Sequence, residues 1–287
     1  MTLLRNNKDT LFRRYDVIAI GIFLLYCLAF AVSRLLISST MELDEAEQFL
    51  LASSFQWGYP SQPPLYSWIV HIISSISGLN VFTLILTKYS LLFLFYSIFY
   101  LTARSLWDAG KSLAVTGSLM LFPLYAYEFN RDLSHSILVT LMAALTCLVY
   151  IRMLPKRTVL CYIFIGLCIA LGILSKYNFF LFFIALATAS LSTKEGRRLM
   201  FDKRSLLSVL ICLIVLLPHL IWLVQENFPP FYHGMRKAQA GELFMYPPTE
   251  ILFTVLSPYA GLLLFFLSVH EERACRLGFC LLQPCMD

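Results

Sequence analysis

The residues with the clearest chemical potential are the acidic pair Asp44-Glu45, which opens an amphipathic stretch between two long apolar runs. The stretch reads E-L-D-E-A-E-Q-F and continues through aromatic residues to the turn signal Gln62-Pro63-Pro64. The loop that contains it, residues 38–80, has no Lys or Arg. Carboxylates at a membrane surface are costly to keep without a positive or protic partner. The pattern therefore indicates chemistry on a lipid-linked substrate.

The acidic pair also has a purely structural interpretation. Asp44 and Glu47 have the spacing of a helix N-cap and an acid at the third helical position. The two interpretations are compatible, because a carboxylate at the start of a helix is held in one place. Spacing alone leaves both open.

Other ionisable residues also leave two interpretations each. Asp132 either caps the next apolar run or lies with Asp44 over one cavity. Lys88 is roughly 10 Å inside its apolar run, where it either reaches back to the interface or binds a ligand. Lys176 and His233 lie in loops and either mark a solvated surface or meet a phosphate.

Histidine and cysteine give little sign of a metal site. His71 and His219 lie in apolar segments and are predicted to be satisfied core histidines. The cysteines within apolar runs are predicted to be buried free thiols; they are Cys27, Cys147, Cys161, Cys168 and Cys212. No spacing of Cys or His favours metal ligation, so we expect no cofactor; a divalent metal bound by Asp and Glu oxygens is left open and is not indicated.

The elements that must position these residues are transmembrane helices. The 287 residues are 59% hydrophobic and 14% charged, with a mean hydropathy of +0.74, whereas a soluble domain has about 25% charged residues. The formal charge of +5 is spread over short loops, so we expect membrane lipids and no nucleic acid as partners. The predicted fold class is an all-α polytopic membrane protein.

About eight runs are long or apolar enough to span a bilayer, which takes roughly 20 residues per helix. They are residues 17–37, 81–103, 112–127, 134–151, 159–174, 179–191, 206–224 and 251–269. Basic residues precede the first run and gather in every second loop after it. By the positive-inside rule both termini are cytoplasmic and the loop 38–80 faces outward. Within this loop, residues 44–57 are predicted to form an interfacial helix, and residues 65–76 are too short to span.

Several motifs, in order along the chain, carry a family resemblance. D-E-A-E-x-F followed by W-G-Y-P-S-Q-P-P-L-Y-S-W resembles the first outer loop of membrane glycosyltransferases with the GT-C fold. More narrowly, it resembles the group of protein O-mannosyltransferases and aminoarabinose transferases. Lys88, the triplet Asn130-Arg131-Asp132, residues 170–177 and residues 218–233 continue the likeness.

The resemblance implies an inverting transfer from a polyprenyl-phosphate sugar donor to a hydroxyl acceptor, which is a glycolipid, a polysaccharide or a protein. The reaction would take place at the outer face of the inner or plasma membrane. The resemblance assigns Asp44 as the base that takes the acceptor's proton, with Glu45 and Asp132 orienting the acceptor. The substrate-binding residues that it implies are Tyr59, Gln62, Lys88, Arg131, Lys176 and His233, the cations among them near the donor phosphate.

One alternative from another functional class is a non-catalytic protein that binds a lipid carrier, or a transporter-like protein. A transporter would show repeated halves with interrupted helices, and the sequence has no such repeat. We expect a cytoplasmic segment at residues 1–16, a GT-C-like transmembrane domain at 17–269 and an unmatched tail at 270–287. Family members are usually longer, so this chain is expected to be C-terminally truncated and to have little activity.

Overall fold

The computed structural model describes residues 14–38, 40–131, 134–230, 232 and 235, and in this part of the chain all regular structure is helical. The all-α prediction is thereby confirmed. Contacts divide the chain into two units: Met1–Gln56 with Pro64–Leu141, and Trp57–Pro63 with Met142–Asp287. Asp132, His233, the candidate span at 251–269 and the predicted tail at 270–287 lie outside the described residues.

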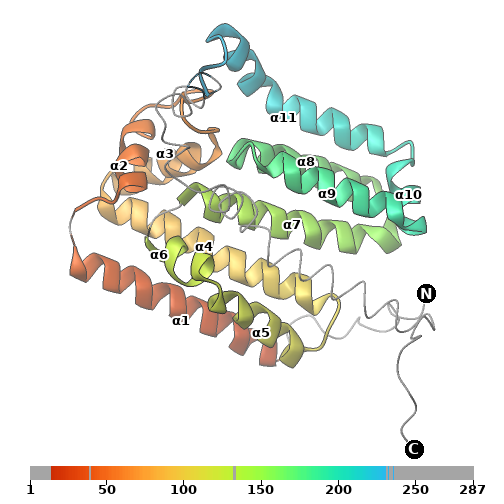
Figure 1. The fold of residues 1–287 in the computed structure, drawn as a ribbon, viewed down its shortest axis with the longest axis horizontal. Helices are drawn as coiled ribbons and strands as arrows, with labels where there is room; N and C mark the ends of the chain where they lie inside the picture. The colour runs from red at the N-terminus through yellow and green to blue at the C-terminus, as the bar shows by residue number, and fades with distance from the viewer. Residues whose placement is uncertain (1–13, 39, 132–133, 231, 233–234, 236–287) are drawn as a thin grey trace, which may run out of the picture. The chain divides into compact units, whose positions relative to one another are not determined.

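The first unit is built around two long apolar helices that lie side by side, α1 and α4 (Figure 1). The first four helices are α1 (Arg14–Ile37), α2 (Leu43–Leu51), α3 (Leu65–Ser77) and α4 (Val81–Arg104). A buried ion pair joins the two long helices: Arg104 Nε lies 2.7 Å from Asp16 Oδ1. The same oxygen accepts a 2.6 Å hydrogen bond from Tyr100. This pair fixes the register of α1 against α4.

The first helix in the loop between α1 and α4 is shorter than the sequence indicates. α2 ends at Leu51 rather than at residue 57, and Phe55 and Trp57 lie beyond its end. The hydroxyl of Ser53 donates to the carbonyl of Leu50 at 2.7 Å, a local bond that competes with helix continuation. The predicted short apolar helix is confirmed as α3.

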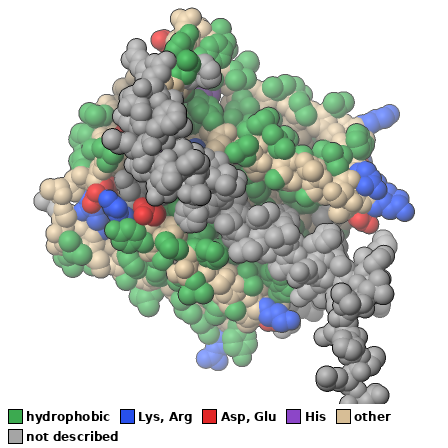
Figure 2. Space-filling view, viewed as in Figure 1, with side chains coloured by type: hydrophobic (Ala, Val, Ile, Leu, Met, Phe, Trp, Pro, Cys, Tyr) green, Lys and Arg blue, Asp and Glu red, His purple; other side chains and the backbone are tan. Residues whose placement is uncertain are grey.

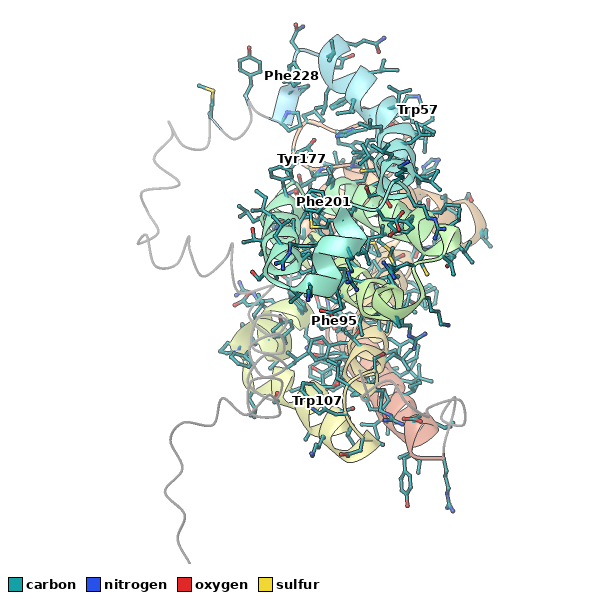
Figure 3. All side chains as sticks on the ribbon, turned by 90° about the vertical axis from the view of Figure 1, so that its right-hand side faces the viewer. Trp57, Phe95, Trp107, Tyr177, Phe201 and Phe228 are labelled. Atoms are coloured by element: carbon teal, nitrogen blue, oxygen red, sulfur yellow. The ribbon has the colours of Figure 1, made fainter. Side chains whose placement is uncertain are left out.

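The candidate span at 112–127 is not one continuous helix. It forms α5 (Ala109–Ser118), the 3-10 turn η1 (Leu119–Leu121) and the π-helical turn η2 (Leu124–Glu128), followed by α6 (Phe129–Arg131). The break falls at Pro123, which has no N–H to donate and clashes with the preceding turn. The π-helical turn lays the ring of Tyr125 on Phe95 of α4, with centroids 5.7 Å apart. Phe95 lies within this aromatic core of the first unit (Figure 3).

The second unit contains most of the remaining long helices. They are α7 (Ser134–Lys156), which begins in the first unit, α8 (Val159–Ser175), α9 (Phe179–Ser192), α10 (Lys194–Met200) and α11 (Ser205–Gln225). α8 packs closely along α11, where a Cβ on Gly166 would lie 2.4 Å from the carbonyl oxygen of Ser208. Only a glycine permits this approach.

A sharp bend of 118° separates α9 from α10. The hydroxyl of Thr193 accepts the N–H of Gly196 at 3.1 Å and so caps α10. Arg197 donates to the carbonyl of Leu191 at 2.7 Å, which covers the open end of α9. Basic side chains gather over α10 (Figure 2). The bend thus separates an apolar helix from a charged one.

The described residues contain four helices that are long and apolar enough to cross a membrane, or five if the bent pair counts as one span. This confirms a polytopic membrane protein. The prediction of free thiols is confirmed for all five cysteines in apolar runs. Cys27, Cys147 and Cys168 are buried, but the prediction of burial is wrong for Cys161 and Cys212, which are half-buried.

Candidate functional site

The acidic pair lies at the start of α2, but the helix cap differs from the predicted one. The N-cap residue is Glu42 rather than Asp44, and the acid at the third helical position is Glu45 rather than Glu47. Glu45 Oε2 accepts the backbone N–H of Glu42 at 3.0 Å. The predicted cap is therefore wrong by two residues, and the register places Glu45 on the buried side, where it is 3% exposed.

Arg34, near the end of α1, forms an ion pair with Glu45. Its guanidinium lies 2.6 Å from Glu45 Oε2, and the side chains are 13% and 3% exposed. The same guanidinium donates to the backbone carbonyls of Ser38 at 2.7 Å and Thr40 at 2.6 Å. The expectation that no basic residue pairs with this acidic cluster is wrong for Glu45, because the partner comes from the preceding helix. Figure 2 shows acidic and basic side chains gathered where α1 ends and α2 begins.

Asp44 points to a different helix. Its Oδ2 accepts the backbone N–H of Ser134, the first residue of α7, at 3.0 Å. A negative charge at a helix N-terminus is favoured by the helix dipole and by the unpaired N–H groups there. Asp44 is half-buried. The carboxylate is therefore held in a defined position while part of it remains open to solvent.

A buried polar network lies one helical turn further along α2. Gln48 Nε2 is 2.6 Å from His135 Nε2, and Gln48 Oε1 accepts a 2.8 Å hydrogen bond from Ser67. The amide group thus joins α2 to α3 and α7. The ring of Tyr66 lies 4.9 Å from the His135 ring, centroid to centroid. Burial raises the pKa of Tyr66 above its usual value, so its hydroxyl stays protonated.

Lys88 lies inside the first unit rather than at its surface. Its side chain is 2% exposed, and Nζ donates to the backbone carbonyl of Asn130 at 3.3 Å. The side chain therefore reaches Asn130 and is not exposed at the surface of this unit. Arg131, the next residue after Asn130, is exposed and places its guanidinium 5.9 Å from the ring centroid of Tyr127.

Asp44 and Lys88 hold the two sides of one short segment. Lys88 bonds the carbonyl of Asn130, and Asp44 bonds the N–H of Ser134. The structure thus brings a predicted base and a predicted phosphate ligand to the same loop. Asp132 belongs to this loop in the sequence but lies outside the described residues.

The other predicted binding residues belong to the second unit. Tyr59 is buried at 1% exposure, while Gln62 and Lys176 are half-buried. Tyr59 and Gln62 lie in the segment Trp57–Pro63, and Lys176 directly follows α8. His233, the remaining predicted ligand, lies outside the described residues.

Sequence reasoning missed three residues of this site: Arg34, Gln48 and His135. The available signal for Arg34 was a lone cation in the last turn of an apolar helix, which usually has a partner. No pattern in the sequence links Gln48 to His135, because they are 87 residues apart. The prediction of satisfied core histidines is only partly correct for His71, whose Nδ1 lies 2.8 Å from the carbonyl oxygen of Ala52 but whose side chain is half-buried, while His219 is buried. Among the described residues no group of three or more His, Cys, Asp or Glu is placed to hold a metal.

Comparison with known sequences gives a family match over more than half of the chain. Residues 61–222 match the sequence profile of a family described as dolichyl-phosphate-mannose-protein mannosyltransferase. The matched range includes Lys88, Arg131 and Lys176 and begins after the acidic pair. No solved structure matches the chain significantly.

Three curated relatives come from Rhizobium johnstonii. The lipopolysaccharide core galacturonosyltransferase RgtB is 36% identical over 191 residues, which cover 66% of this chain and 39% of the relative. The lipopolysaccharide core galacturonosyltransferase RgtA is 34% identical over 194 residues, 67% of this chain and 39% of the relative. The lipid A galacturonosyltransferase RgtD is 22% identical over 205 residues, 70% of this chain and 42% of the relative. The chain therefore spans about two fifths of the length of these relatives.

Proposed function

Because the chain belongs to the dolichyl-phosphate-mannose-protein mannosyltransferase family, we propose that the protein transfers a sugar from a polyprenyl-phosphate donor to a hydroxyl group of lipopolysaccharide. The names of the relatives specify galacturonic acid as the sugar and the lipopolysaccharide core or lipid A as the acceptor. A uronic acid is accordingly the sugar class that we propose here.

The position of Asp44 is the observation that carries this proposal. In an inverting transfer, the acceptor oxygen forms a bond to the anomeric carbon while the bond from that carbon to the phosphate oxygen breaks. The proton of the acceptor hydroxyl passes to a carboxylate, and the lipid phosphate leaves with the bonding electrons. Asp44 is fixed by its 3.0 Å bond to Ser134 and is half-buried. Its carboxylate is therefore held in one place, as a general base must be.

Cations are expected to stabilise the leaving phosphate. The phosphate is already ionised, so it needs positive charge rather than a general acid. Lys88 is buried beside the loop that Asp44 contacts, and Arg131 belongs to the same loop. Lys176 and His233 are further proposed phosphate ligands, and Tyr59 and Gln62 are proposed to bind the sugar. Glu45 and Asp132 are proposed to orient the acceptor, Glu45 through its place beside Asp44.

We further propose that the reaction takes place at the outer face of the inner membrane. The proposal rests on the distribution of basic residues, which predicts that the loop carrying Asp44 faces outward. Lipopolysaccharide as an acceptor agrees with this location. The proposed domain organisation, with residues 17–269 as a GT-C-like transmembrane domain, rests on the same distribution.

Profiling of lipid-linked sugars tests the function directly. Membranes of the source organism with and without the gene are compared by mass spectrometry. We expect a polyprenyl-phosphate uronic acid to accumulate without the gene and lipopolysaccharide to lose the corresponding residue. Unchanged levels of both would contradict glycosyl transfer and favour a protein that only binds a lipid carrier. Expression of the Asp44→Asn variant should fail to restore the modification.

A further inference from the structure

His219 of α11 is held on both nitrogens in the core of the second unit. It is 2% exposed. Its Nδ1 lies 2.9 Å from the carbonyl oxygen of Trp57, and its Nε2 lies 3.0 Å from the hydroxyl of Tyr177. A carbonyl oxygen only accepts, so Nδ1 carries the proton and donates it. In the neutral ring Nε2 is then an acceptor, and the Tyr177 hydroxyl donates to it.

Aromatic stacking holds the same ring from the sides. The His219 ring is stacked with Tyr177 at a centroid distance of 6.1 Å and with Trp222 at 5.8 Å. Trp222 in turn lies directly on Gly58, where a Cβ would come within 2.0 Å of the indole. Figure 3 labels Trp57 and Tyr177, both of which lie next to α11. The segment Trp57–Pro63 is thus pressed onto α11 at a position that only glycine allows.

His219 therefore joins three segments that are far apart in the sequence. Trp57 begins the segment that carries Tyr59 and Gln62, and Tyr177 directly follows Lys176. The third segment is α11 itself. His219 thus links two groups of proposed substrate-binding residues.

We infer that His219 is a positioning residue for donor binding: it holds the segment Trp57–Pro63 and the turn at residues 175–178 in the arrangement that accepts the polyprenyl phosphate. Both ring nitrogens are occupied by the protein, so His219 has no free position for a proton transfer to substrate. This inference rests on the proposed function. Although Tyr177 is 38% exposed, desolvation raises its pKa to about 12, in keeping with a hydroxyl that stays protonated and donates at ordinary pH.

Two substitutions of His219 distinguish the effects of its hydrogen bonds to Trp57 and Tyr177. In His219→Asn the side-chain amide replaces Nδ1, so the bond to Trp57 is kept and the bond to Tyr177 is lost. His219→Phe keeps a stacked ring and loses both bonds. Tyr177→Phe removes only the hydroxyl and keeps its ring. His71→Phe is the matched control, because His71 also bonds a backbone carbonyl and lies 6.0 Å from an aromatic ring, but in the first unit.

The first measurement is hydrogen–deuterium exchange of the full protein in detergent micelles. We expect His219→Phe to increase exchange at residues 57–63 and 175–178, and His219→Asn and Tyr177→Phe to increase it mainly at 175–178. His71→Phe should leave both segments unchanged. Unchanged exchange at 57–63 in a folded His219→Phe protein would overturn the inference. If that variant does not fold, unchanged exchange at 175–178 in both of the milder variants overturns it.

The second measurement is the affinity for polyprenyl phosphate in the same micelles. His219→Phe loses both hydrogen bonds that hold the binding segments, so we expect it to weaken binding by about 10- to 100-fold and His219→Asn to weaken it less. Equal affinity of wild type and His219→Phe would overturn the role in donor binding. A wild-type protein with no measurable affinity would count against the proposed function, and the exchange data would then decide separately whether His219 holds the two segments.

Discussion

Arg34 and Glu45 form a 2.6 Å ion pair that is largely shielded from solvent. The pair ties the end of α1 to the start of α2 and occupies Glu45 Oε2 together with the N–H of Glu42. Asp44, the neighbouring residue, points instead to the N–H of Ser134 at 3.0 Å. Two adjacent carboxylates are thereby given different surroundings, one neutralised by an arginine and one at a helix N-terminus.

We expect the effects of substituting Arg34 and Glu45 on the free energy of unfolding to be strongly non-additive. Removing one partner of a buried pair leaves the other charge uncompensated, at a cost of about 3–5 kcal/mol. We therefore expect Arg34→Gln and Glu45→Gln each to lower thermal stability in detergent markedly. The double variant should recover part of the loss, because no buried charge remains.

A double-mutant cycle on unfolding gives the coupling energy of the pair. The matched control is the exposed pair of Lys111 and Asp108. Lys111 Nζ lies 4.0 Å from Asp108 Oδ2, and the side chains are 67% and 65% exposed. This pair should show a coupling energy near zero. Additive effects of the two substitutions at Arg34 and Glu45 would contradict the buried ion pair.

Asp44→Asn is expected to abolish transfer while the protein still folds and inserts. The amide oxygen of Asn can still accept the N–H of Ser134, so α7 keeps its cap, but the amide cannot take a proton at neutral pH. Loss of a general base typically lowers the rate about 100- to 10,000-fold. Transfer is measured with purified protein and a polyprenyl-phosphate sugar.

The control for this substitution is Glu47→Gln, one helical turn further along α2. Its carboxylate is not part of the capping box of α2, which Glu42 and Glu45 form, and its loss should change the rate little. An Asp44→Asn protein with wild-type turnover would show that Asp44 is not the base. Loss of rate in both variants would indicate a general effect of charge on α2.

Much of the fold could be predicted from apolar run length and loop charge. The bounds of α1, α3, α4 and α11 agree closely with the predicted runs, because these helices are long or bounded by clear breaks. The prediction of one spanning helix at 112–127 is wrong because Pro123 interrupts the helix. Hydropathy does not detect a residue that lacks an N–H donor. The predicted N-cap of α2 is wrong by two residues because the acids at 42, 44, 45 and 47 allow more than one pair of capping residues.

The contacts of the site were less accessible to prediction than its location. The acidic loop was found from composition, but the ion pair of Glu45 depends on how α1 and α2 meet. The bonds from Gln48 to His135 and from His219 to Trp57 join residues 87 and 162 positions apart. Such pairs leave no periodic pattern in a single sequence, since they depend on tertiary packing alone.

Topology is testable with a cysteine at Ser61. This residue lies in the loop predicted to face outward and is half-buried, so a small reagent can reach it. We expect Ser61→Cys to react with a membrane-impermeant maleimide added from outside, and Arg198→Cys on α10 to react only after the membrane is opened. Both cysteine variants are made in a protein whose native Cys275, Cys280 and Cys285 are replaced by Ser, so that these thiols do not react with the reagent. The reverse pattern of labelling would overturn the orientation.

Lys88 provides a test of phosphate binding that separates affinity from stability. Its side chain is 2% exposed, and Nζ donates to the backbone carbonyl of Asn130 at 3.3 Å. Burying a charge is costly, so Lys88→Gln should leave the stability of the empty protein unchanged or higher, since the amide can still donate to Asn130. A hydrogen bond to a charged group is worth about 1.5–3 kcal/mol. We therefore expect affinity for polyprenyl phosphate to fall about 10- to 100-fold.

Lys111→Gln is the matched control, because it removes an exposed lysine from α5 in the same unit. Lys111→Gln should change neither the stability of the protein nor its affinity for polyprenyl phosphate. Lys88→Arg keeps the charge and should retain part of the affinity, although the larger group will strain the packing of α4. Thermal unfolding with and without polyprenyl phosphate measures both effects in one series. Lower stability of Lys88→Gln with unchanged affinity would mean that Lys88 supports the loop at Asn130 and does not bind the donor phosphate.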